Sequence, residues 1–370
     1  MTGSKWLNRV VMTAGAVMAL SWVSLAQAQP APTWDALAAA ARREGTLVVI
    51  GPAHQEVRRV LGPAFKKRFG VDLEYLGGSG GVAASRLRAE RTAGLYTADI
   101  GLAAIQTLAT VFYPEKMLDP IKPLLVMPEV LDKTKWKRGD LWFPDPEGQY
   151  VLRLFSYMGE MFTVNTDHVK PQDLRSARDL LLNPKWKGKI AVHDPRASGT
   201  GSNIAAQFYA QMGGEDFLRK FYVDQKPMIS TKERQLTDWL LRGTYPIVIG
   251  GDASEVEKMR NEGMPVLALF DLDDVKSVIT GGNGMIVLFN KAPHPNAAKL
   301  FVNWIASKEG LELYARASKR ATTRSDIDEA SFLPPESIPR PGVEYFDSYD
   351  WDFSVETKAM VRKMMEQMLR

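Results

Sequence analysis

The chain has 370 residues, with 47 Lys and Arg against 43 Asp and Glu, a formal net charge of +4, and no cysteine. So small an excess of positive charge is not typical of a nucleic-acid-binding protein. The absence of cysteine excludes a disulfide framework, thiol chemistry and anchoring through a lipid-modified cysteine.

The first 28 residues have the pattern of a secretory signal peptide. Lys5 and Arg9 precede an almost wholly apolar run over 10–25, and the sequence AQA at 26–28 is a small-x-small cleavage site. The apolar run is shorter than a membrane-spanning helix needs and lacks a charged flank on its far side. We therefore expect cleavage after residue 28, and an exported chain of 342 residues that is not inserted in the membrane and carries 45 basic and 43 acidic residues.

The mature chain begins with alternating strands and helices. Leu47 to Ile50 is an apolar run typical of a buried strand, and apolar residues recur at helical spacing from Val57 to Phe69. A second strand is indicated over 71–76, and after a glycine-rich loop a helix over 82–90 precedes a third strand over 98–102. This order predicts a right-handed parallel α/β unit, in which ligands bind beyond the carboxyl ends of the strands.

A second α/β set follows. A strand ending at His193 leads through a Pro-containing turn to a glycine-rich loop and an apolar helix, and 245–263 gives another strand, a Gly-Gly turn and a helix. The chain is Pro-rich over 333–342 and ends in a Met-containing amphipathic helix over 356–369, whose methionines we assign to core packing. At about 150 residues per domain, the mature chain is expected to form two domains.

The loop GGSGG at 77–81 fits both the G-x-S-x-G motif of serine hydrolases, around Ser79, and the start of the G-x-G-x-x-A dinucleotide motif. A secreted serine hydrolase would need an acid and a later histidine at the same sheet edge, and none of the histidines at 168, 193 and 294 has a suitable position. The dinucleotide motif needs an acid at the end of a strand, whereas Asp99 begins one, where a structural capping role is expected. We therefore expect no catalytic residue and no cofactor, and interpret the loop as a neutral ligand contact.

Several longer stretches span nearly the whole mature chain: GTLVVIGPAHQE, ADIGLA, NPKWKGKIAVHDPRASGT, VIGGDASEVEKMRNEG, GGNGMIVL and HPNAAKLFVNWIASKEG. In this order they resemble the periplasmic solute-binding proteins of ABC importers, in particular the two-lobed branch that includes the ferric-ion-binding proteins. The last stretch is the most distinctive, whereas the glycine loops alone would be weak signals.

The resemblance implies an α/β, type II two-lobed periplasmic-binding-protein fold, in which each lobe is a mixed, mostly parallel sheet flanked by helices and the lobes are joined by hinge strands. Lobe one is expected from 33–119 and 276–330, and lobe two from 120–275 and 345–370. The resemblance also implies a monomeric periplasmic protein that is not an enzyme. It would capture a small solute by hinge closure and deliver it to a membrane permease with its ATPase.

The candidate ligand-binding residues lie where strands give way to helices or in glycine turns. Free amide groups and the positive end of the helix dipole favour oxyanions there, glycines allow close approach, and Ser and Thr add hydroxyl donors. The candidates are His54, Gln55, Ser79, Gly80, Arg196, Ser198, Gly199, Thr200, Asp252 and Asn283. Ser198 and Thr200 could equally be helix caps, and Arg196 could equally be a solvated turn residue rather than an anion clamp.

The identity of the solute is constrained by what the chain lacks. Iron-binding members of the resembled branch use a tandem tyrosine pair on the turn that matches GGDASEVEK, where this chain has Ala253-Ser254, and none of its 11 tyrosines is adjacent to another. His54 falls where that branch has a ligand histidine, but one imidazole cannot hold a hard trivalent ion, and four histidines without cysteine give no zinc-type spacing. We expect no metal ligands and a small anionic or phosphorylated organic solute, with ferric iron bound together with chelating anions as the alternative.

Overall fold

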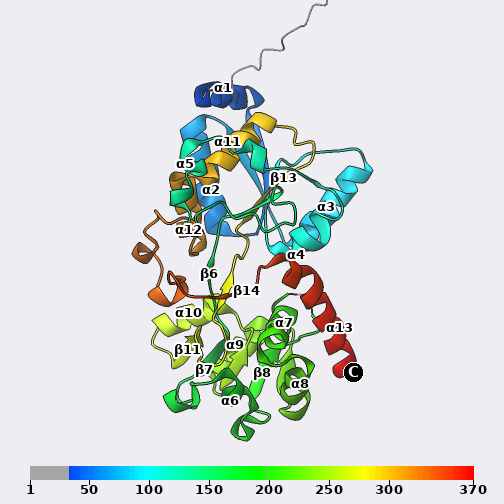
Figure 1. The fold of residues 1–370 in the computed structure, drawn as a ribbon, viewed down its shortest axis with the longest axis vertical. Coiled ribbons are helices and arrows are strands. Elements are labelled where there is room, and N and C mark those ends of the chain that lie inside the picture. Colours follow the sequence, from blue (N-terminus) through cyan, green and yellow to red (C-terminus); the bar gives the residue numbers. More distant parts are fainter. Residues whose placement is uncertain (1–32, 198) are drawn as a thin grey trace, which may run out of the picture.

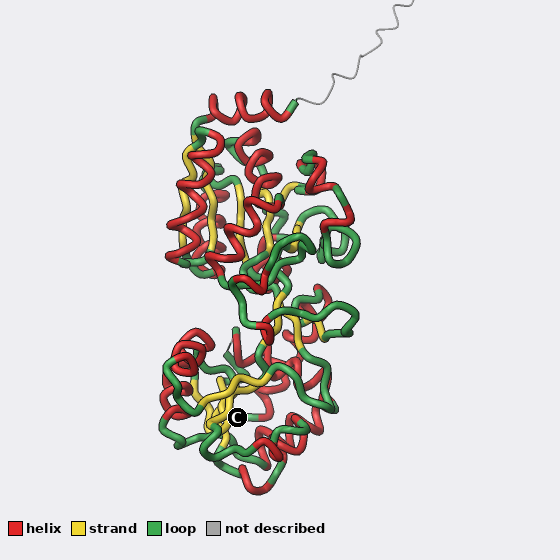
Figure 2. The backbone as a smooth tube through the Cα atoms, turned by 90° about the vertical axis from the view of Figure 1, so that its left-hand side faces the viewer, coloured by secondary structure: helices red, strands yellow, loops and turns green. Residues whose placement is uncertain are grey.

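The structure is a computed structural model that describes residues 33–197 and 199–370. Two bodies of sheet and helix follow one another along the longest axis and are joined by a narrower waist (Figures 1 and 2). We call the body that contains the N-terminal strands lobe one and the other lobe two. The expected signal peptide and the candidate Ser198 lie outside the described residues.

Lobe one is built on a mixed sheet of order β2-β1-β3-β13-β4, with β5 also paired to β13. β1 runs parallel to β2 and β3, whereas β13 returns antiparallel to β3, so the predicted parallel unit at the start of the chain is confirmed. The strands are β1 (Thr46–Gly51), β2 (Asp72–Gly77), β3 (Ile100–Ala103), β4 (Leu118–Asp119), β5 (Val151–Arg153) and β13 (Met285–Phe289). The helices are α1 (Trp34–Glu44), α2 (Gln55–Phe69), α3 (Gly80–Thr92), α4 (Ile105–Thr107), α5 (Pro128–Leu131), α11 (Pro295–Ala306) and α12 (Lys308–Ser318).

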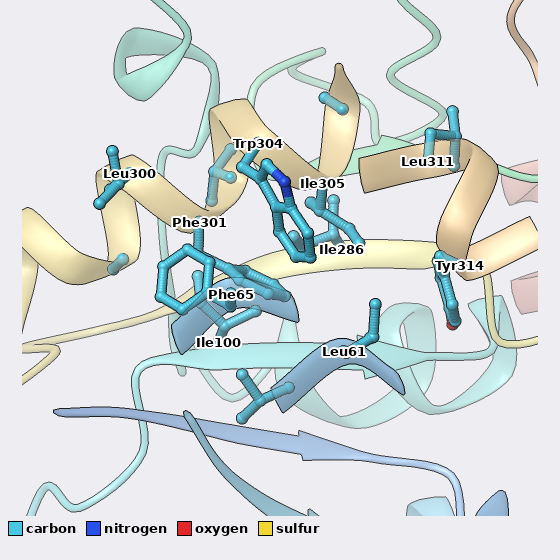
Figure 3. Packing of buried hydrophobic residues seen from close by; sticks show 14 of the residues in the cluster. Leu61, Phe65, Ile100, Ile286, Leu300, Phe301, Trp304, Ile305, Leu311 and Tyr314 are labelled. Atoms are coloured by element: carbon cyan, nitrogen blue, oxygen red, sulfur yellow. The ribbon is translucent and has the colours of Figure 1, made fainter. Parts of the chain in front are cut away.

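Aromatic side chains of α2 and α11 hold the core of lobe one together. Phe65 lies with its ring centroid 5.3 Å from that of Phe301 and 5.4 Å from that of Trp304, and all three are almost fully buried (Figure 3). Such edge-to-face and tilted pairs add about 0.5–1.5 kcal/mol each beyond area burial. The distinctive apolar stretch near 300 is therefore a packing element that seats α11 against α2.

Lobe two is built on a second mixed sheet, of order β11-β7-β10-β8-β9. β8 lies parallel to β9 and β10, and the antiparallel β7 pairs with β10 and β11. Its strands are β7 (Phe162–Asn165), β8 (Ile190–His193), β9 (Met228–Ser230), β10 (Ile247–Ile249) and β11 (Val266–Leu269). Its helices are α6 (Ala177–Leu182), α7 (Thr200–Met212), α8 (Gly214–Arg219), α9 (Glu233–Leu241), α10 (Ala253–Asn261) and α13 (Lys358–Met368).

Three short strands cross the waist as a small sheet of order β14-β12-β6: β6 (Tyr157–Gly159), β12 (Val278–Thr280) and β14 (Phe346–Asp347). Arg153, fully buried at the end of β5, donates from Nη1 to Asp347 Oδ2 at 2.7 Å, and its guanidinium lies 3.8 Å from the ring centroid of Trp142. The pair ties lobe one to β14. A buried charge pair of this kind is costly to break because the remaining ion has no partner.

The packing places the boundary between the lobes later than the sequence predicts. Residues 121–155 were expected in lobe two, yet Ile121, Val130 and Phe155 belong to the lobe-one core and β5 pairs with β13. The apolar side chains of this segment find their partners on α11 and α12 rather than on the second sheet. Which lobe a connecting segment joins depends on that long-range match, which its own sequence does not reveal.

The C-terminal helix packs on lobe two, as expected. Met365 is fully buried in the lobe-two core, and Met364 and Met368 pack against that core, but Met360 is 44% exposed. The methionine stripe is thus a packing face for three of its four members. Short 3₁₀ turns occupy 122–124, 133–135, 171–173, 184–186, 329–331 and 335–337, and π-helical turns 108–112, 220–224 and 353–357. Within the described part of the chain, no helix combines the length and apolarity needed to cross a membrane.

Candidate functional site

A cavity of about 590 Å³ is lined by residues of both lobes, and we call it the interlobe cavity. Lobe one contributes residues that follow β3, and lobe two contributes the first turn of α7, which follows β8. The third wall comes from the C-terminal segment and α13. Its polar lining residues are Gln106, Thr110, Thr200, Ser202, Asn203, Tyr349, Lys358 and Arg362. Because the carboxyl ends of β3 and β8 open onto the same space, this is where an α/β protein is expected to bind a ligand.

The glycine loop lines a separate, much smaller cavity of about 70 Å³ in lobe one. Ser79, Gly80 and Asn283 line it together, so the structure brings these three candidates to one place. Gly80 is needed for packing, because a Cβ at this position would lie 2.0 Å from Thr107 Oγ1. The glycines therefore let the backbone of this loop pack closely against α4, whereas the sequence suggested close approach to a ligand. This packing leaves little room for a ligand group.

Ser79 itself acts as the N-cap of α3. Its hydroxyl accepts a hydrogen bond from the Val82 amide at 3.3 Å, which satisfies one of the free N–H groups of the first turn. Of the three later histidines that a hydrolase could use, His294 is engaged elsewhere, because its Nδ1 lies 2.9 Å from Asp99 Oδ2. Asp99 also accepts from the amides of Val48 and His294, which confirms its expected structural role at the start of β3.

His54 and Gln55 stand at the start of α2. His54 is the N-cap residue, and its Nδ1 accepts from the Val57 amide at 3.5 Å, while Gln55 is exposed. Among residues 33–197 and 199–370, no group of three or more His, Cys, Asp and Glu side chains is placed to hold a metal ion. His54 is therefore a helix cap at the start of α2.

The first turn of α7 carries two further candidates. Gly199 is the N-cap residue with φ 111°, a conformation that side chains disfavour, and it gives the helix no side-chain cap. The Thr200 hydroxyl donates to Glu233 Oε1 at 2.7 Å, so it is oriented by α9. Gly199 and Thr200 both line the interlobe cavity.

Arg196 is held within lobe two. Its Nε and Nη2 donate to the two carboxylate oxygens of Asp194 at 2.9 and 2.8 Å, and Nη1 donates to the Leu369 carbonyl at 3.1 Å. This hydrogen bonding holds the pKa of Asp194 below its ordinary value. Since Asp194 already occupies the guanidinium fork, the geometry favours a turn-stabilising role over an anion clamp.

Asp252 lies at the start of α10. Its carboxylate accepts from the Glu255 amide at 3.1 Å, and its own amide donates to Thr237 Oγ1 at 2.9 Å. An acid at a helix N-terminus is stabilised by the dipole as well as by this hydrogen bond. Asp252 is therefore explained by capping, in the same way as Ser79 at α3.

A third cavity, of about 310 Å³, lies on the β6 side of the waist, next to the first turn of α10. Glu160, Arg260 and Arg320 line it with Tyr157. Burial raises the pKa of Glu160 to about 7, against a smaller opposing effect of Arg320. Arg260 is paired with Glu336 at 2.8 Å, which closes one side of the cavity with a turn from the Pro-rich segment.

The charged residues of the interlobe cavity were not predicted from the sequence. Lys358 and Arg362 fall within the amphipathic last helix but were not singled out, and neither were Gln106 and Thr110. The available signal was the spacing of Lys358 and Arg362, four residues apart and so on one helix face. That spacing alone does not distinguish a binding face from a solvated one.

Comparisons with known proteins agree with this architecture. Residues 51–312 match the family model described as bacterial extracellular solute-binding protein. An uncharacterized protein of Haemophilus influenzae is 25% identical over 297 residues, covering 75% of this chain and 78% of that protein. Two of the solved structures that match over 88% of this chain illustrate the similarity. The FutA protein of Trichodesmium, in complex with iron and citrate, is covered to 99% with a TM-score of 0.67 and 17% identity. AfuA of Actinobacillus pleuropneumoniae, with fructose-6-phosphate bound, is covered to 99% with a TM-score of 0.63 and 18% identity.

The chain belongs to the bacterial extracellular solute-binding protein family, because the family model covers well over half of it. It is thus an extracellular solute-binding protein with the two-lobed periplasmic-binding-protein fold, and both expectations from the sequence are confirmed. The family is of a solute-binding, non-catalytic kind.

Proposed function

We propose that this protein captures a small anionic or phosphorylated organic solute between its lobes in the periplasm, and delivers it to a membrane permease powered by an ATPase. The observation that carries the proposal is the interlobe cavity, whose walls come from the carboxyl ends of β3 and β8. A solute in that position touches both lobes, so its binding favours the arrangement in which the lobes are closest.

The residue ranges of the two lobes and of the hinge follow from the packing of the two cores. We propose that lobe one comprises 33–155 with 281–330, lobe two 160–275 with 350–370, and that β6, β12 and β14 act as the hinge. Of the positions nominated from the sequence, Gly199 and Thr200 line the interlobe cavity. His54, at the start of α2, would meet the solute from lobe one once the lobes approach, whereas Ser79 and Asn283 line the small cavity beside α4.

Solution scattering tests this function directly. The mature protein, monomeric in our proposal, is measured alone and with citrate, fructose 6-phosphate, inorganic phosphate and ferric citrate, after a thermal-shift screen with the same compounds. A ligand at a hundred times its dissociation constant stabilises the folded state by about 2.7 kcal/mol, which such a screen detects. We expect the radius of gyration to fall with a binding solute, and an unchanged profile at saturation would contradict hinge closure.

Ferric iron bound with chelating anions is the second candidate, favoured by the fold shared with the iron- and citrate-bound FutA. This chain has alanine at 253, at the first position of α10, where the iron-binding branch it resembles has a tyrosine. Calorimetry with ferric chloride and with ferric citrate separates the candidates. Tight binding of uncomplexed ferric ion with a phenolate charge-transfer band would overturn our preference for an organic anion.

A further inference from the structure

The interlobe cavity has a one-sided charge. Lys358 and Arg362, one turn apart on α13, are the charged residues among the described residues that line it, and no Asp or Glu lines it. With low-dielectric walls around it, a cavity lined by one sign of charge concentrates ligands of the opposite sign. The C-terminal helix therefore gives the cavity a positive potential that neither sheet edge provides.

Lys358 is the more constrained of the two cations. Its side chain is only 7% exposed, and Nζ donates to the Ser348 carbonyl at 3.0 Å and to Ser354 Oγ at 3.4 Å. An ammonium group has three donors, so one remains. Burial lowers the pKa of Lys358 to about 8 against a smaller opposing effect of Asp347. Asp347 is already paired with Arg153 at 2.7 Å, so an anion in the cavity would supply a charge partner of its own to this buried ammonium.

Arg362 is exposed and less restrained. Its guanidinium makes one long contact, 3.7 Å from Nε to Glu366 Oε1, between two side chains that are both about half exposed. Exposed pairs of this kind contribute little energy and readily exchange partners. The planar fork of Arg362 is consequently able to turn toward a carboxylate or phosphate in the cavity.

The wall opposite α13 offers hydrogen-bond donors. The first turn of α7 begins at Thr200 without a side-chain cap, so its amides are directed at the cavity with the positive end of a 13-residue helix. Asn203 also lines the cavity, and its buried Oδ1 has no hydrogen-bond partner in the described structure. Because the oxygen and nitrogen of an amide exchange places by rotation, Asn203 is able to present its NH₂ group.

We propose that α13 is part of the solute site: Lys358 and Arg362 hold the anionic oxygens of the solute against the first turn of α7, while Gln106 and Thr110 contact it from lobe one. The inference rests on the proposed function and deepens it, since it assigns the anion-binding cations to the C-terminal helix. The ligand class is a phosphate oxyanion, either the free ion or a phosphate group on an organic solute small enough for about 590 Å³.

The test is isothermal titration of the mature protein with inorganic phosphate, fructose 6-phosphate and neutral fructose. Arg362→Gln and Lys358→Met remove the two cations, and Lys363→Gln is the matched control, because Lys363 is an exposed cation on the same helix outside the cavity. We expect roughly tenfold weaker binding of phosphate or of fructose 6-phosphate for each cavity variant, and no change for the control. Tighter binding of fructose 6-phosphate than of phosphate identifies a phosphorylated organic solute, and the reverse identifies the free ion.

Three results would overturn the inference: no binding of either anion by the wild type, equal losses for Arg362→Gln and Lys363→Gln, or no loss for either cavity variant. Lys358→Met alters a buried site, so thermal unfolding accompanies each titration, and the exposed Arg362→Gln carries the test alone if Lys358→Met is unstable.

Scattering distinguishes failure of this inference from failure of the proposed function. If neutral fructose compacts the wild type and the α13 variants equally, solute capture is supported and the role of α13 is contradicted. If no solute compacts the wild type although phosphate binding depends on Arg362, the anion site is supported and solute capture by hinge closure is contradicted.

Discussion

The two lobes offer different surfaces to the space between them. In lobe one, the glycine loop packs closely on α4 and leaves a neutral cavity of about 70 Å³, whereas on the lobe-two side α7 and α13 border the interlobe cavity of about 590 Å³ with two cations. In the lobe-one surface, the backbone of the glycine loop packs against neighbouring backbone and small side chains. The lobe-two surface is open and positively charged, and its two cations come from the C-terminal helix.

This contrast shows that a glycine-rich turn is not by itself a sign of ligand contact. Gly80 faces Thr107, and Gly201 in the first turn of α7 faces the end of β8, so both are explained by close packing. Lys358, which has unused hydrogen-bonding capacity, lies in a segment without any glycine motif. Substitutions at each surface should therefore have different consequences.

The largest effect is expected at Gly201. A Cβ there would lie 2.0 Å from the Asp194 carbonyl oxygen and 2.8 Å from His193 Nδ1, and a backbone atom cannot move aside cheaply. We expect Gly201→Ala to lower the free energy of unfolding by about 2–3 kcal/mol, measured by urea denaturation. A loss below about 0.5 kcal/mol would show that the backbone at the end of β8 moves easily enough to accommodate the added methyl group.

Glu160 should make stability depend on pH. Its pKa is about 7 in the folded protein against 4.5 for the free side chain, so the folded state binds the proton more tightly. Stability therefore falls as pH rises from about 4.5 to 7. At pH 8, Glu160→Gln should raise the free energy of unfolding by about 1–3 kcal/mol, where the lower values correspond to partial exposure of the side chain. At pH 4 the same substitution should change the free energy of unfolding little. Denaturation curves with equal shifts at both pH values would contradict this.

A smaller loss is expected at Gly80. The added Cβ would meet the Thr107 side chain at 2.0 Å rather than backbone, so part of the clash is relieved by that side chain. We expect Gly80→Ala to cost about 1–2 kcal/mol and Thr107→Ala to recover part of it. A double-mutant cycle measures the coupling, and a coupling near zero would mean that α4 moves instead.

The smallest effect, of opposite sign, is expected one residue further on. Gly81 lies inside α3, and a Cβ there would meet nothing within 4 Å. Gly81→Ala should therefore stabilise the protein by about 0.5–1 kcal/mol through helix propensity and the unfolded state. It is also the matched control for Gly80→Ala, and a destabilised Gly81→Ala variant would reveal a crowded environment that the structure does not show.

Much of the fold was predictable because the strands and helices follow from the spacing of apolar residues a few positions apart. The strands at 47–50 and 98–102, the helix after His54 and the last helix follow from apolar periodicity, and the strand-to-helix turns that carry His54, Ser79 and Asp252 were located correctly. What these turn residues do was less predictable. Ser79 and Asp252 cap their helices, and Arg196 is bound by Asp194, which lies two residues away in the same turn.

The sequence by itself determined the two α/β units, their order and the family, because periodicity and turn chemistry are set by residues a few positions apart. Only the tertiary structure decided that 121–155 joins lobe one and that α13 closes a cavity with α4 and α7. Those outcomes depend on which apolar faces fit each other across roughly 140 to 250 residues of intervening chain, a match of shapes that no local pattern encodes.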